Sequence, residues 1–374
     1  MVGGGIVGAA CAYQLALGGV DVLLFDRGSP AGGASGACEG DVLVADKRPG
    51  PELELARLGL DAYDRLASRF EDEMELERKG ALLVDSSPEE HAVTAAVVAE
   101  MVAAGVDARV LDADSLRQLE PSLADDLIGG ALFPDDVQVW PMKVVRALLR
   151  GATEHGAQLS FGVGVSKITT RAGRVTGVTS RHGTVAADTV VVAAGVASGP
   201  LLAACGVSLP VYARKGQIAV TEPAAGFVAH KVIASSYMNT VHVASDRPQI
   251  ATVLETTPRG NVLIGSSRRD HDETVHTDPG VTAALIRAGR SIAPGLDSLL
   301  VIRTYAGARP ALPDSQPAIG RTAQLDGLIV ATGHEGAGIG NGPVTGELVA
   351  GLVQGAQPPF DLTPFAPDRF VKAA

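Results

Sequence analysis

Three of the four glycines within residues 3–8 form the pattern G-x-G-x-x-G, which constrains the fold more than any other feature. An Ala-rich segment over residues 7–17 follows, and an apolar run over residues 20–25 ends at Asp26. Glycines at this spacing let the backbone approach a pyrophosphate at a helix N-terminus, and an acidic residue after the next strand binds ribose hydroxyls. The segment therefore predicts a Rossmann-type dinucleotide site with Asp26 on the adenosine ribose.

The first strand of this unit is unusually short. Only Met1 and Val2 precede the glycines, whereas a strand normally supplies about five residues. Either the start of the chain is assigned too late or the central strand is truncated. In the second case we expect weaker retention of the cofactor.

The composition favours a globular protein and excludes several classes. At 374 residues, 46% of them hydrophobic and 20% charged, the chain is long enough for two lobes. A formal net charge of −11 argues against nucleic-acid binding, which needs clustered Lys and Arg. No secretory signal and no run that could span a bilayer is visible, so we expect a cytoplasmic protein without membrane insertion.

The cysteines argue against a metal centre. Cys11, Cys38 and Cys205 are odd in number and widely spaced, without a C-x-x-C pair. This excludes a disulfide framework, and no iron–sulfur or zinc site is expected in this chain. We interpret the thiols as small buried hydrophobes.

Hydrophobic periodicity predicts alternating strands and helices along the rest of the chain. A continuous apolar run, as at residues 189–195, is typical of a sheet covered on both faces. Helices are expected near residues 51–70, 92–104, 143–155, 281–291 and 343–354, strands near 81–84, 189–195, 217–221, 251–255, 262–264 and 328–333, and a small β-meander over 158–165, 173–180 and 184–188.

A second glycine-rich turn helps to choose the cofactor, because both NAD and FAD fit the first one. The run Gly333–Gly340 lies between a buried strand and a helix, so it offers backbone N–H groups and a second helix dipole. Two such places far apart in sequence suit a long ligand, and a helix N-terminus stabilises the negative charge of a reduced flavin. We therefore predict FAD; alternatively, the run is a loop that closes a sheet.

Taken in order, these segments resemble the D-amino-acid-oxidase superfamily of FAD-dependent amine oxidoreductases. Within it, residues 40–47 and 333–336 look most like the flavin subunits of hydrogen cyanide synthase, opine oxidase and D-hydroxyproline dehydrogenase. The resemblance covers nearly the whole chain and rests on Gly3–Asp26, Ala34-Ser35-Gly36, Val190–Gly195, Arg214-Lys215-Gly216-Gln217, Gly265-Ser266-Ser267, Arg309–Asp314 and Gly333–Gly340.

The resemblance implies an α/β (α+β) fold with two domains. A discontinuous Rossmann-type FAD-binding domain is expected over residues 1–80, 134–205 and 303–374. A second, mostly antiparallel sheet-plus-helix substrate domain is expected over residues 81–133 and 206–302.

The resemblance also implies the chemistry. An amine or amino acid, of proline, hydroxyproline, glycine or opine type, loses a hydride from its α-carbon to flavin N5 and becomes an imine. We expect the chain to be one subunit of a heteromeric dehydrogenase whose partner subunits carry FAD or iron–sulfur groups. The alternative is a self-sufficient oxidase of glycine, sarcosine or D-amino acids that produces hydrogen peroxide.

Two further function classes stay open. An NAD(P)-linked reductase is disfavoured because the chain holds one complete dinucleotide fingerprint, which FAD would already occupy. A noncatalytic scaffold that binds flavin weakly is favoured only by the short first strand.

The candidate site residues come from the motifs and from the resemblance. Arg309 is expected to hold a substrate carboxylate in a bidentate manner, or else to pair with Asp314 or a backbone carbonyl. Glu255 could face the pocket or be a solvated strand residue, and His334 could contact the ring or substrate or be structural. No metal ligand is expected. The cofactor-binding candidates are Gly3, Gly5, Ile6, Val7, Gly8, Asp26, Arg27, Ala34, Ser35, Gly36, Val165, Ala194, Gly195, Gly307, Arg309, His334, Glu335, Gly336, Ala337, Gly338 and Ile339.

Lys47 and Arg48 close the long glycine-rich loop after Asp26. They could face a partner or the phosphate, but an ordinary surface position is the favoured interpretation.

Overall fold

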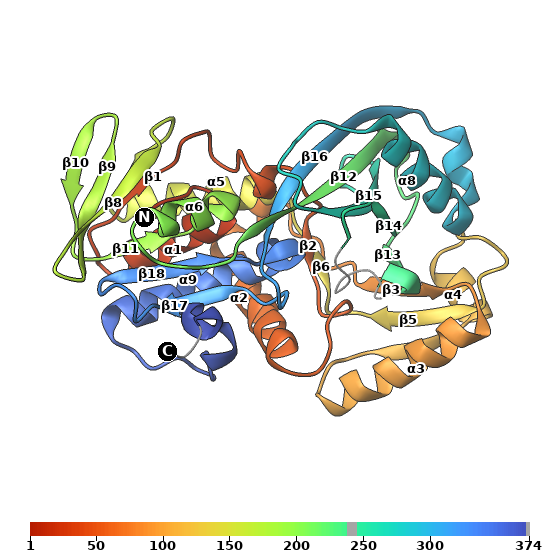
Figure 1. The fold of residues 1–374 in the computed structure, drawn as a ribbon. Coiled ribbons are helices and arrows are strands. Elements are labelled where there is room, and N and C mark those ends of the chain that lie inside the picture. Colours follow the sequence, from red (N-terminus) through yellow and green to blue (C-terminus); the bar gives the residue numbers. More distant parts are fainter. Residues whose placement is uncertain (238–244, 372–374) are drawn as a thin grey trace.

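A computed structural model describes residues 1–237 and 245–371 of the chain. The chain forms two halves that lie side by side (Figure 1). One half holds both termini and a mainly parallel sheet, and the other is built on an eight-stranded sheet. The predicted α/β class is confirmed.

The sheet of the first half is built around Val2. This residue forms parallel bridges with Phe25 on one side and Val192 on the other, so a very short segment takes the central position. Its strands are β1 (Leu23–Phe25) and β7 (Gln158–Ser160), paired in parallel, and β11 (Val190–Val192), β18 (Leu328–Thr332) and β17 (Ala318–Arg321), of which only β17 runs antiparallel to its neighbour.

Small residues bring the helices of this half close together. Gly342 and Gly346 of α9 pack against Ile6 and Ala10 of α1, and a β-carbon at Gly346 would lie 2.6 Å from the Ala10 carbonyl carbon. Burial on several sides explains why α1 is rich in Ala rather than amphipathic. The helices of this half are α1 (Ile6–Leu17), α2 (Pro51–Met74), α5 (Pro141–Glu154), α6 (Ser198–Ala203) and α9 (Gly338–Gln354).

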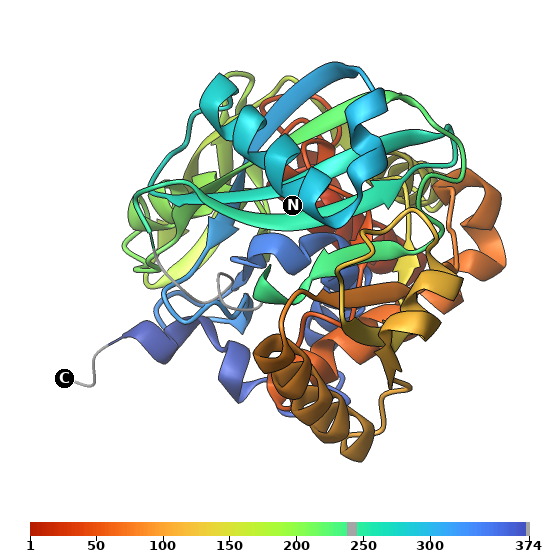
Figure 2. The same cartoon turned by 90° about the vertical axis from the view of Figure 1, so that its right-hand side faces the viewer.

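The second half is a mostly antiparallel sheet with helices on its outer face. Figure 2 shows α8 and α3 in front of this sheet, on the side turned away from the first half. Its strands in spatial order are β16 (Val301–Ala311), β12 (Tyr212–Pro223), β15 (Asn261–Asp270), β14 (Gln249–Thr256), β13 (Lys231–Ala234), β3 (Ala81–Asp85), β5 (Gly129–Phe133) and β4 (Arg109–Asp112), and its helices are α3 (Pro88–Ala103), α4 (Ala113–Leu119) and α8 (Pro279–Ile292).

Smaller elements complete the molecule. A three-stranded antiparallel meander consists of β8 (Val165–Arg171), β9 (Arg174–Ser180) and β10 (Gly183–Ala186), and β2 (Asp41–Val42) pairs with β6 (Val137–Gln138). Short 3-10 turns are η1 (Ala34–Gly36), η2 (Gly195–Ala197), η3 (Ser235–Tyr237), η4 (Pro294–Ser298), η5 (Glu335–Ala337), η6 (Thr363–Phe365) and η7 (Pro367–Phe370).

Two expectations about the elements are wrong. Residues 158–160 do not begin the meander; they pair with β1, and the meander starts at Val165. The last helix begins at Gly338, so Pro343 lies inside it. A proline there removes the N–H that would reach the Ile339 carbonyl, and the Tyr63 hydroxyl donates to that carbonyl instead, at 2.9 Å.

The division into domains stays a prediction. The proposed boundary at residue 303 falls within β16, which lies wholly in the eight-stranded sheet. In the described ranges 1–237 and 245–371, no helix has the length and apolar character needed to cross a bilayer.

The contact between α1 and α9 can be tested with Gly346→Ala. The added β-carbon would meet backbone atoms of Ala10 at 2.6 Å and 2.7 Å, so we expect a loss of about 1–3 kcal/mol in unfolding free energy. Urea unfolding measures this. Gly351→Ala is the control on the same helix, because its β-carbon would meet only Ala356 at 3.7 Å. Equal stability of both variants would contradict the close approach.

Candidate active site

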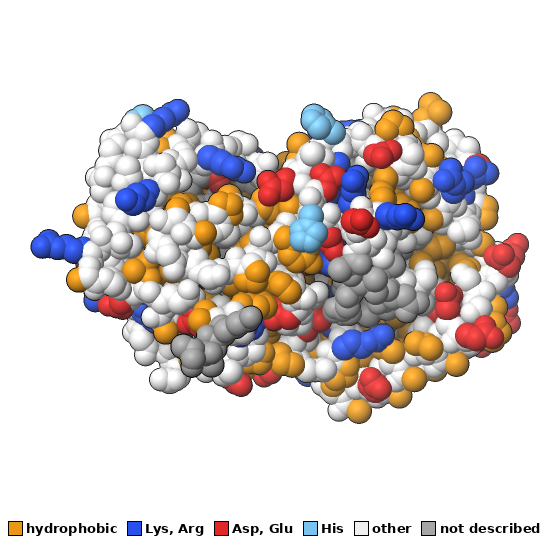
Figure 3. All heavy atoms as spheres, viewed as in Figure 1, with side chains coloured by type: hydrophobic (Ala, Val, Ile, Leu, Met, Phe, Trp, Pro, Cys, Tyr) orange, Lys and Arg blue, Asp and Glu red, His pale blue; other side chains and the backbone are white. Residues whose placement is uncertain are grey.

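A cavity of about 850 Å³ connects the two glycine-rich turns. Gly3 and Gly5 line it at one place and Gly336 and Gly338 at another, although more than three hundred residues separate them in sequence. Its volume lies in the range of cofactor and ligand sites. Figure 3 shows acidic, basic and histidine side chains close together on the surface where the two halves meet.

The first turn depends on glycine for steric reasons. Gly3 has φ +109°, and a β-carbon there would lie 2.2 Å from the Ala193 carbonyl oxygen. A β-carbon at Gly8 would lie 1.9 Å from the Gly3 oxygen. Gly5 is the N-cap residue of α1 and lines the cavity, and it has no side chain that could fill the space at the helix N-terminus.

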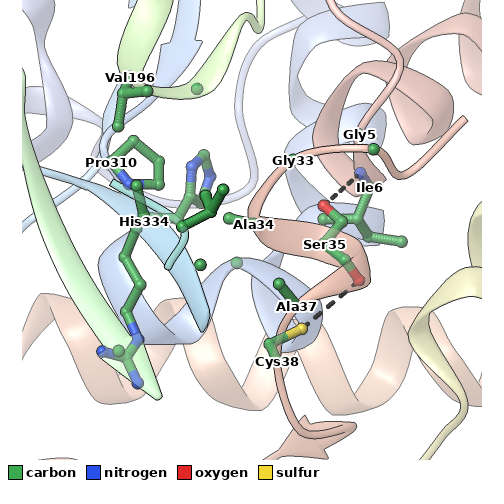
Figure 4. A pocket seen from close by; sticks show the side chains of 18 of the residues that line it. Gly5, Ile6, Gly33, Ala34, Ser35, Ala37, Cys38, Val196, Pro310 and His334 are labelled. Atoms are coloured by element: carbon green, nitrogen blue, oxygen red, sulfur yellow. Dashed lines mark hydrogen bonds between the residues drawn. The ribbon is translucent and has the colours of Figure 1, made fainter. Parts of the chain in front are cut away.

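The side chains of Asp26 and Ser35 accept hydrogen bonds from the backbone of this turn. The Asp26 carboxylate accepts hydrogen bonds from the Gly4 N–H at 2.7 Å and the Gly28 N–H at 2.6 Å. Ser35 Oγ accepts one from the Ile6 N–H at 3.0 Å. Figure 4 shows Gly5, Ile6 and Ser35 on one side of the cavity. Both side chains line the cavity, and the role of Asp26 toward a ribose stays a prediction.

Val196, Pro310 and His334 face that wall from the other side (Figure 4). His334 is only 4% exposed, and its Nε2 lies 2.9 Å from Thr345 Oγ1. Burial lowers the pKa of His334 to about 4. The imidazole is therefore neutral near pH 7, and it both lines the cavity and makes a structural hydrogen bond.

Arginines surround Glu335 at the sheet side of the cavity. Glu335 Oε1 lies 3.7 Å from Arg268 Nε, 3.8 Å from Arg214 Nη1 and 4.0 Å from Arg309 Nε. Arg214 also forms a two-point ion pair with Asp270, at 2.6 Å and 3.3 Å. Burial raises the pKa of Glu335, but the three guanidinium groups outweigh it and hold that pKa below its usual value. The carboxylate is therefore ionised and screens part of the positive charge.

Arg309 lines the cavity, and its guanidinium is fixed in place. It donates to the Ser267 carbonyl and to Ser266 Oγ, both at 3.0 Å. It also lies against Gly216, where a β-carbon would be 2.4 Å from Nη1. Arg309 therefore contacts a backbone carbonyl and not Asp314, and its role toward a substrate carboxylate stays a prediction. Asp314 instead pairs with Arg369.

Several predicted residues do not lie in the cavity wall. Glu255 is 1% exposed; it accepts from Gln138 and pairs with Lys231 Nζ at 2.8 Å, so it is neither pocket-facing nor solvated. Gly8, Gly36 and Ala337 also lie outside the lining. The predicted residues that do line the cavity are Gly3, Gly5, Ile6, Val7, Asp26, Arg27, Ala34, Ser35, Val165, Ala194, Gly195, Gly307, Arg309, His334, Glu335, Gly336, Gly338 and Ile339.

Lys47 corrects another expectation. It is buried, and its Nζ lies 3.1 Å from Asp46 and 3.3 Å from Glu52, so its charge is neutralised within the protein. Arg48 is half-buried.

The sequence reasoning missed other residues in the cavity wall. Glu39, Asp41, Tyr237, Arg268 and Tyr305 all line it. The available signal was the position of Glu39 and Asp41 in the loop that also supplies Ser35. In the part of the chain that the structure describes, no group of three or more His, Cys, Asp or Glu side chains could hold a metal ion.

The geometry fits FAD in two respects. Turn glycines that exclude a β-carbon, and a helix N-terminus whose cap residue Gly5 lines the cavity, suit a pyrophosphate. A β-carbon at Gly336 would meet no atom within 4 Å, so backbone is exposed to the space at the second turn as well.

Comparisons with known proteins agree with this geometry. Residues 1–352 match the DAO family, described as FAD dependent oxidoreductase. Glycine oxidase from Bacillus licheniformis is 30% identical over 95% of this chain and 92% of its own length. Hydrogen cyanide synthase subunit HcnC from Pseudomonas aeruginosa is 27% identical over 99% of this chain and 95% of its own.

A solved structure extends the likeness to the fold. The crystal structure of glycine oxidase from Geobacillus kaustophilus superposes with a TM-score of 0.90 at 27% identity, covering 99% of this chain and 98% of that one. The resemblance seen in the motifs is therefore confirmed, as are the enzyme class and the FAD cofactor. The chain belongs to the DAO family of FAD-dependent oxidoreductases.

Proposed function

We propose that this chain oxidises an α-amino acid or related amine at its α-carbon, with release of an imine. The glycine oxidase and hydrogen cyanide synthase relatives support this reaction class. FAD, when bound, supplies the hydride acceptor at flavin N5. The residues of the chain supply binding, orientation and electrostatics.

The cofactor would be held at both glycine turns. The Gly3–Gly5 backbone and the N-terminus of α1 would bind the pyrophosphate, and Asp26 the adenosine ribose. Gly336, Gly338 and the N-terminus of α9 would stabilise negative charge at the flavin end.

The observation that carries the proposal is the position of Arg309. Its guanidinium lies in the cavity wall and is anchored by Ser266 and Ser267. A planar guanidinium fixed in this way is suited to a carboxylate, which it binds through two parallel hydrogen bonds. The nearby Arg268 adds positive charge, which Glu335 of η5 offsets in part.

No residue of the cavity is assigned as an obligatory base. His334 is neutral near pH 7, and its Nε2 is engaged by Thr345. Hydride loss needs the substrate amine in its neutral form, since an ammonium group has no lone pair to stabilise the developing imine.

We further propose that the chain works as the flavin subunit of a heteromeric dehydrogenase. A relative named as a subunit of hydrogen cyanide synthase supports this arrangement. In this proposal, electrons pass from the chain to FAD or iron–sulfur groups in partner subunits. A self-sufficient oxidase that forms peroxide is the second candidate, supported by the 30% identity to a glycine oxidase.

Replacing Arg309 tests the carboxylate site. In Arg309→Met we expect the apparent affinity for amino acids to fall about a hundredfold, because a buried charge partner contributes about 2–5 kcal/mol. The measurement is anaerobic flavin bleaching against amino acid concentration. Arg303→Met is the control, since Arg303 is an exposed cation on the same strand. Comparable loss in both variants, or none in Arg309→Met, would refute the assignment.

Peroxide release separates the two arrangements. As a dehydrogenase subunit, the purified flavin-loaded chain should reduce an artificial electron acceptor with amino acid but release little peroxide in air. Stoichiometric peroxide at the full rate of flavin reduction would instead establish the oxidase. The panel should include glycine, sarcosine, proline, hydroxyproline isomers and opines.

The neutral state of His334 predicts a pH-dependent stability. The folded pKa of about 4 lies below the ordinary value of 6.5, so the unfolded chain binds more protons between these values. The stability that the buried neutral imidazole contributes is fully present above pH 6.5. It is lost as the pH falls toward 4, by up to about 3 kcal/mol. Urea unfolding of the protein and of His334→Gln across this range should give a shallower slope for the variant. Identical slopes would contradict a buried neutral imidazole.

A further inference from the structure

We propose that Glu39 forms a subsite for the substrate amino group beside Arg309. The substrate enters with its carboxylate on Arg309 and its ammonium group on Glu39, and the ammonium can give one proton to the Glu39 carboxylate, which leaves the neutral amine that hydride loss requires. The inference rests on the proposed amino acid oxidation. It adds a residue that fixes the second polar group of the substrate.

The first observation is an acceptor without a donor. Glu39 is only 8% exposed and lines the cavity, yet its Oε1 has no hydrogen-bond partner among residues 1–237 and 245–371. Buried polar atoms are nearly always hydrogen-bonded, because leaving an acceptor unpaired is costly. A ligand that brings an N–H group to this wall would satisfy Glu39.

The second observation is the balance of charge around Glu39. Lys231 of β13 pairs with Asp41 of β2 and with Glu255 of β14, so one ammonium group already serves two carboxylates. Glu39 is therefore a third carboxylate in a cluster with one lysine. A cation from the substrate would reduce this imbalance, whereas a neutral donor would not.

The other groups that face Glu39 do not replace such a cation. Tyr305 of β16 directs its hydroxyl to the Cys38 carbonyl, at 3.4 Å. Arg309 acts on Glu39 only at longer range. Burial raises the pKa of Glu39, Asp41 adds to this, and Lys231 and Arg309 oppose it. A cation bound against Glu39 would favour its ionised form.

The third observation is that Glu39 and Arg309 contact neighbouring residues of β15. Glu39 Oε1 lies against Gly265, since a β-carbon there would be 1.8 Å from it. Arg309 is bound to Ser266 and Ser267, the next two residues of the same strand. A carboxylate and a guanidinium are thus presented side by side. An α-amino acid carries its ammonium and carboxylate on one carbon, which matches this arrangement.

The test compares two ligands that differ only in the amino group. Neither 2-aminoisobutyrate nor pivalate has an α-hydrogen, so neither is oxidised, and pivalate replaces the ammonium with a methyl group. Both are titrated into the oxidised flavin-loaded protein, with the flavin absorbance as the readout. We expect the protein to prefer 2-aminoisobutyrate, and Glu39→Gln to lose about tenfold or more of this preference with little change for pivalate.

A second variant displaces Glu39, and a control variant changes a buried glutamate outside the cavity. Gly265→Ala leaves the carboxylate in the chain but displaces it, so it should lose the same preference. Glu120→Gln is the control: Glu120 is 2% exposed, accepts from the Ala229 and His230 N–H groups, and does not line the cavity. It should keep the preference.

The outcomes separate this subsite from the proposed function. Unchanged preference in Glu39→Gln, equal weakening of both ligands, or no preference in the unaltered protein would each overturn the subsite. The proposed function is judged apart from this, by whether any amino acid bleaches the flavin of the unaltered protein without oxygen.

Discussion

The architecture depends on backbone contacts that only glycine allows. The Gly8 α-carbon lies against the Gly3 carbonyl, and Gly3 lies against Ala193, which follows β11. These contacts bring the turn close to the sheet, and Gly5, the cap residue of α1, lines the cavity. Gly346 allows α9 to pack closely on α1, and the second glycine turn, at the start of α9, lines the same cavity.

Cationic and anionic side chains lie next to each other around the cavity. Arg214, Arg268 and Arg309 surround Glu335, and Glu39 and Asp41 line the wall near Lys231. Arg214, Arg268, Lys231 and Glu39 are buried, so they interact with neighbouring charges more strongly than exposed groups would. An amino acid carries both signs of charge, and a wall with both signs is complementary to it in a way that an apolar pocket is not.

Sequence reasoning succeeded where the signal is local. The glycine spacing, the buried strands near residues 190 and 328, and the hairpin of β14 and β15 follow from steric limits and periodicity within short segments. It failed where a distant partner changes the outcome. Pro343 looked like a helix start, but Tyr63 satisfies the carbonyl that the proline leaves free. Residues 158–160 looked like part of a meander, but β1 is their partner.

The sequence by itself therefore determined the family, the cofactor and the two glycine turns that line one cavity, because a glycine-only turn is a property of a few consecutive residues. Only the tertiary structure decided which charged side chains lie together in and behind the cavity wall. Arg309 meets Arg214 because β16 and β12 pair in that register, and Arg214 meets Asp270 through the register of β12 and β15. Glu255, one strand further along at β14, is directed to Lys231 instead. Register is fixed by pairing between distant segments, so no short stretch of sequence specifies it.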